Sequence, residues 1–113
     1  MVLSAPDKNG GTPFHSAAHR GHLHVAEFLL EYCGIDVDIR NRNGQTSLYT
    51  ASRNGKLDVV RFLIDQGAAI HTGDNDSWNS LHLASYHGYL DVVQQLTDSD
   101  NPIDIRGGNN RLL

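Results

Sequence analysis

Histidine is the residue type in this chain whose spacing comes closest to that of a chemical site. The chain has 7 histidines, and four of them stand close together at His15, His19, His22 and His24. His15 and His19 are four residues apart, so on a helix they would share one face, as zinc-binding histidines do. The surrounding sequence offers no cysteine pair, ligating carboxylate or HExxH glutamate to complete a set of ligands. The sequence therefore predicts no metal site and no cofactor.

Other patterns that indicate catalysis are also missing from the sequence. It contains no glycine-rich phosphate loop, no G-x-S-x-G nucleophile motif, and no carboxylate pair on one helix face beyond scattered aspartates and glutamates. We therefore expect a protein that is not an enzyme and that has no small-molecule substrate.

The histidine cluster belongs to a longer pattern that occurs three times. The copies begin at Thr12, Thr46 and Asn79, so their starts lie 34 and then 33 residues apart. Alanine and glycine recur at fixed places in each copy, as Ala17, Ala51 and Ala84 and as Gly21, Gly55 and Gly88. A period of this length indicates supersecondary units stacked end to end.

Each copy predicts two short helices joined at its glycine. After the glycine, apolar residues recur at helical spacing, which in the second copy gives Leu57, Val60, Leu63 and Ile64. A threonine or asparagine precedes the first helix of every copy, and its side-chain oxygen can accept a hydrogen bond from an unpaired N–H group of that helix. We expect first helices over residues 13–20, 47–54 and 80–87, and second helices over residues 23–32, 57–66 and 90–98.

These motifs resemble those of the ankyrin repeat family. The family's T-P-L-H motif appears at residues 12–15 and, in altered form, as Thr-Ser-Leu-Tyr at 46–49 and Asn-Ser-Leu-His at 79–82. The resemblance covers about residues 7–106. It implies a mainly α fold, an ankyrin-type solenoid of helix-turn-helix pairs with projecting β-hairpin loops. It also assigns His15 and His82 to hydrogen bonds that join neighbouring repeats.

The resemblance implies one ankyrin repeat domain over residues 1–113. Its repeats fall at about 8–41, 42–74 and 75–107, with a tail at 108–113. Both ends of such a stack would expose surfaces that a further repeat covers, with Phe14 and the Leu112-Leu113 tail nearby. We therefore expect marginal stability or end-to-end self-association.

The resemblance further implies where a partner binds. In ankyrin arrays, the hairpin tips and the outward positions of the first helices form a concave face. The candidate protein-binding residues on that face are Arg20, Arg40, Arg42, Arg53, Asn75, Trp78, Tyr86 and His87.

Charge is distributed unevenly over the predicted faces. The formal net charge is −4, yet most of the 9 basic residues fall on the concave face, namely Lys8, Arg20, Arg40, Arg42, Arg53 and Arg106. A groove that is basic over the first two repeats would attract an acidic segment of a partner. In the third repeat, Trp78 and Tyr86 are of the types enriched at interface hot spots, so an apolar anchor is the other partner feature we expect.

The sequence thus predicts a non-enzymatic protein–protein interaction module that holds a protein partner in its concave groove. The alternative is a structural segment of a longer ankyrin array, acting as a spacer or scaffold with its binding surface elsewhere. Nucleic acid is a poor third candidate, because the chain carries a net charge of −4 and has no basic run.

The remaining composition concerns location. No apolar run approaches the ~18 residues that a membrane span needs, so membrane insertion is not expected. Cys33 is the single cysteine and cannot form an internal disulfide, and residues 1–5 lack the features of a signal peptide. These features favour an intracellular location, cytoplasmic or nuclear.

Overall fold

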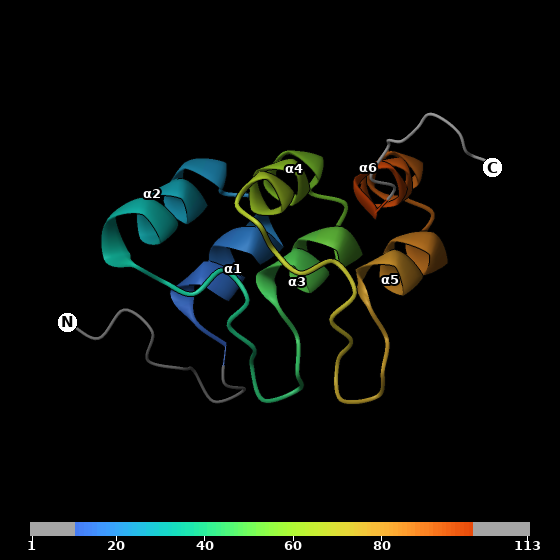
Figure 1. The fold of residues 1–113 in the computed structure, drawn as a ribbon, viewed down its shortest axis with the longest axis horizontal. Coiled ribbons are helices and arrows are strands. Elements are labelled where there is room, and N and C mark those ends of the chain that lie inside the picture. The colour runs from blue at the N-terminus through green and yellow to red at the C-terminus, as the bar shows by residue number, and fades with distance from the viewer. Residues whose placement is uncertain (1–10, 101–113) are drawn as a thin grey trace.

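The computed structural model describes residues 11–100, with side chains described over 11–99. Within that part the chain forms six α-helices: α1 Pro13–Arg20, α2 Leu23–Cys33, α3 Ser47–Arg53, α4 Leu57–Asp65, α5 Ser80–His87 and α6 Leu90–Asp100. The mainly α solenoid expected from the sequence is confirmed. Figure 1 shows α1, α3 and α5 side by side in one layer, α2, α4 and α6 in a second, and the loops before α3 and α5 projecting from the first layer.

The first helix of each repeat begins where its capping residue predicts. Thr12, Thr46 and Asn79 have extended backbones, and their side-chain oxygens accept the N–H groups of His15, Tyr49 and His82 at 3.3, 3.2 and 3.0 Å. In the outer repeats the histidine completes a capping box, because its Nδ1 accepts the N–H of the capping residue. These bonds satisfy donors that the first turn would otherwise leave unpaired.

His15 also joins two repeats. Its Nδ1 accepts the backbone N–H of Thr12, so the ring proton resides on Nε2. Nε2 then donates to the carbonyl oxygen of Gln45 at 2.9 Å, across the boundary between the first and second repeats. The link that the resemblance assigned to His15 is confirmed.

The glycine between paired helices is required by the neighbouring repeat as well as by the turn. Gly21 and Gly55 adopt φ values of 75° and 68°, which residues with a side chain rarely adopt. A Cβ on Gly21 would approach Lys56 Cδ to 2.9 Å, and one on Gly55 would approach the Tyr89 ring to 2.8 Å. Each glycine therefore leaves space into which a side chain of the next repeat packs.

The loops are closed by backbone hydrogen bonds and by side chains, without a strand ladder in the described residues. No strand occurs within residues 11–100. In the loop before α3, Asn41 Oδ1 accepts the N–H groups of Asn43 and Gln45, and one backbone bond of 2.9 Å joins Asn41 N to Gln45 O. Asp74 holds the loop before α5 in the same way. The expected hairpins are thus tight turns organised by Asn or Asp, which mimic backbone turns.

The core lies between the two layers and between successive repeats. Phe14, Leu48, Leu63 and Leu96 are fully buried. Phe14 lies in the end repeat on α1, as expected, but its side chain is fully buried in the core cluster, so it adds no exposed apolar surface to that end. The Leu112-Leu113 tail lies outside the described residues. Self-association through the ends remains a prediction, without Phe14 as a contributor.

Leu48 and Leu81 offer a test of the stack, because they occupy the same position in successive repeats. Leu48 is 1% exposed and Leu81 is 37% exposed. We expect Leu48→Ala to lower the free energy of unfolding by about 2–5 kcal/mol, and Leu81→Ala by roughly 1 kcal/mol or less. Urea unfolding followed by circular dichroism measures both changes. Equal losses would contradict the packing described here.

Candidate functional site

Two hollows open on one face of the molecule, formed by α1, α3, α5 and the projecting loops, which we call the inner face. One lies between α1 and α3 beside the loop at residues 41–45. The other lies between α3 and α5 beside the loop at residues 74–78. They occupy equivalent places in successive repeats, so the stacking that forms one also forms the other. Their linings differ in chemistry.

The hollow between α1 and α3, which we call the basic hollow, has a volume of about 220 Å³. It is lined by Gly11, His15, Ser16, His19, Arg20, Asn41, Gln45, Thr50 and Arg53. Arg20 is exposed and Arg53 half-buried, and none of the described residues that line this hollow is a carboxylate. Asn54 donates to His19 Nδ1 at 3.1 Å, which ties α3 to α1 beside this hollow. The basic hollow therefore suits an anionic group.

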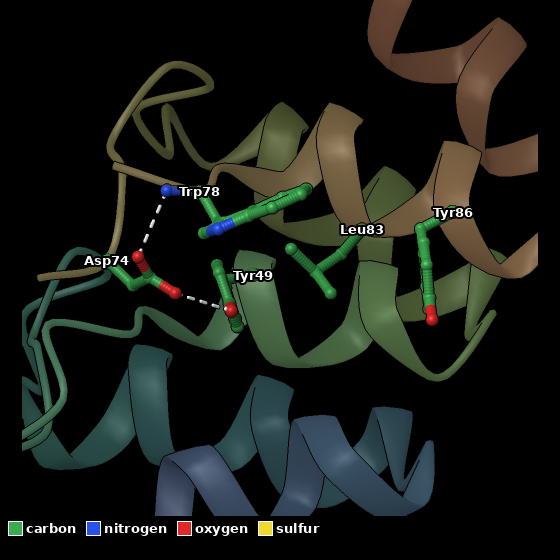
Figure 2. A pocket seen from close by; sticks show the side chains of 5 residues that line it. All are labelled: Tyr49, Asp74, Trp78, Leu83 and Tyr86. Carbon is green, nitrogen blue, oxygen red and sulfur yellow. Dashed lines mark hydrogen bonds between the residues drawn. The ribbon is translucent and has the colours of Figure 1, made fainter. Parts of the chain in front are cut away.

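The hollow between α3 and α5, which we call the aromatic hollow, has a volume of about 350 Å³. It is lined by Tyr49, Asp74, Trp78, Leu83 and Tyr86 (Figure 2). Tyr49 is buried, whereas Trp78 and Tyr86 are large exposed side chains. The Trp78 ring meets the His82 ring edge-on at a centroid distance of 5.4 Å. This hollow is mostly apolar, with one carboxylate at its loop end.

Asp74 organises the loop and the aromatic hollow together. Its Oδ1 accepts the backbone N–H groups of Asp76 and Trp78 at 2.8 and 3.0 Å, and its Oδ2 accepts the Tyr49 hydroxyl at 2.7 Å. Burial alone would raise the pKa of Asp74, but these hydrogen bonds and the nearby His82 hold the pKa below its ordinary value of 3.8. The carboxylate is therefore ionised at neutral pH.

Tyr49 is the partner of Asp74 across the boundary between the second and third repeats. Burial of its phenol raises the pKa of Tyr49 to about 12, with help from the hydrogen bond to Asp74 and from the charge of that carboxylate. Tyr49 stands at the position that His15 and His82 occupy in the other repeats. It donates to the next loop as His15 does, but to a carboxylate rather than to a carbonyl.

The predicted binding residues divide into three groups. Arg20 and Arg53 line the basic hollow, and Trp78 and Tyr86 line the aromatic hollow. The other four predicted residues, Arg40, Arg42, Asn75 and His87, line neither. That any of the eight contacts a partner stays a prediction.

Two of the residues outside the hollows connect the projecting loops. Arg40 donates to the carbonyl oxygens of Gly44 and Gly73 at 3.1 and 2.9 Å, and Asn75 Nδ2 donates to the carbonyl oxygen of Arg42 at 2.8 Å. These bonds hold the two loops beside each other. Arg40 and Asn75 thus help to fix the shape of the inner face. His87 packs its ring against Tyr86 and Tyr89.

The sequence interpretation did not include Tyr49, Asp74 and Leu83 among the binding residues. The available signal was Tyr49 itself, because it replaces a histidine in one copy of a repeated motif. A phenol reaching the next loop needs an acceptor there, and Asp74 is the acidic residue of that loop which supplies it.

Three of the four clustered histidines make side-chain contacts that stabilise the fold. Both ring nitrogens of His15 are hydrogen-bonded, His19 accepts from Asn54, and His24 bonds to Glu27. Over residues 11–99, the structure holds no group of three His, Cys, Asp or Glu side chains close enough to bind one metal ion. Among the helices described, none has the length and apolar character needed to cross a membrane.

Removing the Tyr49 hydroxyl tests its bond to Asp74. We expect Tyr49→Phe to lower the free energy of unfolding by about 1.5–3 kcal/mol, the usual range for a hydrogen bond to a charged group. Tyr32→Phe on α2 is the matched control, since Tyr32 is exposed and its hydroxyl should contribute nothing measurable. Equal stability of the wild type and Tyr49→Phe in urea would show that the bond is dispensable.

The raised pKa of Tyr49 also predicts a pH dependence. The folded protein holds the Tyr49 proton more tightly than the unfolded chain, whose tyrosine has a pKa of 10.0. The contribution of Tyr49 to stability is therefore complete below pH 10 and is lost as the pH rises toward about 12. The stability difference between wild type and Tyr49→Phe should shrink over that window in urea titrations. A constant difference would contradict the assignment.

Comparison with known proteins supplies the family. A search of curated proteins finds no match to this sequence. The family model described as ankyrin repeats (3 copies) matches the chain over two overlapping stretches, residues 2–74 and 33–107. Together these stretches include all three helix pairs described above. The chain belongs to the ankyrin repeat family.

Proposed function

We propose that this chain is a non-enzymatic interaction module, which holds a segment of a protein partner on its inner face. Ankyrin repeats are generally protein-interaction modules, and the family is typically non-enzymatic. The observation that carries the proposal is the pair of adjoining hollows, one basic and one mainly apolar, at equivalent places in successive repeats. A segment lying along the inner face would reach both.

The basic hollow favours a partner segment with an acidic side chain. Arg20 and Arg53 come from neighbouring repeats and present guanidinium groups, which recognise carboxylates through paired hydrogen bonds. Exposed acidic side chains such as Asp58, Asp65 and Asp91 lie instead on α4 and α6, in the other layer. A local excess of positive charge speeds the encounter with an acidic segment despite the net charge of −4.

The aromatic hollow adds apolar contact. Trp78 and Tyr86 are large, rigid side chains with polar edges, and Trp and Tyr are enriched where interfaces derive most of their affinity.

An intracellular site of action is part of this proposal, and it rests on Cys33, the single cysteine, which has no disulfide partner.

Charge reversal in the basic hollow tests the proposal. Peptides that bind the wild-type chain are selected from a displayed random library. Their affinities for the wild type and for the double variant Arg20→Glu/Arg53→Glu are then compared. We expect enrichment of acidic peptides, and at least about tenfold weaker binding by the double variant. Arg61→Glu on α4 is the control, because it changes charge on the other layer.

Two results would contradict the proposal. One is a wild-type chain that enriches no peptide, which would instead favour the role of spacer or scaffold. The other is a double variant that stays folded and binds the selected peptides as tightly as the wild type does.

A further inference from the structure

The aromatic hollow contains the negative charge of Asp74, which forms no ion pair with any described residue and has His82 as a nearby basic side chain. Within residues 11–99, no lysine or arginine lies within 4.0 Å of the Asp74 carboxylate. Asp74 instead depends on Tyr49 and on two backbone N–H groups. A purely apolar group placed over this carboxylate would remove water from it and offer no compensating interaction. A positive charge at the Asp74 end of an occupant would supply this interaction and is therefore favoured.

The hydrogen bonds of Asp74 restrict the kind of cation. A carboxylate has about four acceptor sites. Oδ1 already accepts two N–H groups and Oδ2 accepts the Tyr49 hydroxyl, so about one site is left. A guanidinium that binds as a fork needs both oxygens free on one side. An ammonium is a compact charge that needs no such geometry, and a methylated ammonium needs fewer hydrogen bonds still.

The rest of the lining suits an aliphatic chain that ends in such a cation. Figure 2 shows Leu83 between Tyr49 and Tyr86, with Trp78 and Asp74 toward the loop end of the hollow. Aromatic faces attract cations, and tryptophan attracts them most strongly. Leu83 provides apolar contact for the methylene stem. Three aromatic rings, one leucine and one carboxylate thus meet in a single hollow of about 350 Å³.

We propose that the aromatic hollow binds a lysine side chain of the protein partner, with its ammonium group, free or methylated, beside Asp74 and its stem over Leu83. The inference rests on the proposed function, because it assigns a residue type to the partner segment. It replaces the simple apolar anchor expected from the sequence. Together with the basic hollow, it gives the inner face opposite charge preferences at its two ends, and so a preferred direction for the bound segment.

The test uses small probes with the whole chain. Choline carries a trimethylammonium group, butylammonium a free ammonium on an aliphatic stem, and 3,3-dimethylbutan-1-ol is the neutral counterpart of choline with the same shape. Trp78 is the single tryptophan of the chain, so its indole N–H resonance and its fluorescence report directly on the hollow. We expect saturable binding of at least one cation, with the neutral alcohol about tenfold weaker or worse. Comparing choline with butylammonium shows whether methylation improves binding.

Two variants locate the effect. Tyr86→Leu removes an aromatic ring from a residue that is 78% exposed, so the fold should be unaffected and the affinity for the cation should fall about threefold or more. Tyr32→Leu on α2 is the matched control, since Tyr32 is 76% exposed and lies outside the hollow. Asp74→Asn should lower the affinity for the cation about tenfold and leave the affinity for the neutral alcohol unchanged. If Asp74→Asn disturbs the loop, the comparison of Tyr86→Leu with Tyr32→Leu still shows whether the cation binds in the aromatic hollow.

The proposal is overturned if choline and its neutral counterpart bind equally well, if neither cation binds, or if Tyr86→Leu binds cations like the wild type. These failures differ from failure of the proposed function. Peptide binding that depends on Arg20 and Arg53, without any cation binding, would contradict only the proposed lysine contact in the aromatic hollow. Cation binding in a chain that selects no peptide would contradict the proposed interaction module and show only that the hollow binds cations.

Discussion

The fold and the site both depend on the burial of each helix pair against the next. Leu48 in the middle repeat is buried, whereas Leu81 at the same position of the third repeat is partly exposed. The glycines between paired helices show how close this contact is, since the Tyr89 ring fills the space that a side chain on Gly55 would need. A solenoid repeat cannot bury its apolar face alone. The packing of each repeat against the next therefore determines the spacing between repeats.

This spacing creates the site, because both hollows lie at repeat boundaries. Asp74 and Tyr49 are 25 residues apart in sequence and meet at 2.7 Å only when α5 packs beside α3. The same position in the first repeat holds His15, which bonds to a backbone carbonyl instead. A constant scaffold with a variable side chain at one place thus gives two neighbouring hollows with different chemistry. In the second repeat, the tyrosine at this position bonds to a carboxylate that lines the hollow.

Much of the fold could be predicted from the sequence, because local signals determine it. The first helix of the first repeat begins and ends as expected, since Thr12 caps its start and Gly21 adopts the left-handed backbone at its end. The burial of Phe14 could not be predicted from its position near one end, because that burial depends on how the helices pack into the core. The structural roles of Arg40 and Asn75 were also missed, since bonds between two loops have no signature within either loop. Tyr49 was visible as a departure from the motif, but its partner could be found only once the loops were placed.

Chemical-shift mapping tests the central claim most directly, namely that the inner face formed by the stack binds a partner. The amide resonances of the chain are followed while a library-selected peptide is added. The account predicts shift changes at α1, α3, α5 and the loops at residues 41–45 and 74–78, with little change at α2, α4 and α6. Changes concentrated on α2, α4 and α6, with the residues of the two hollows unaffected, would contradict it.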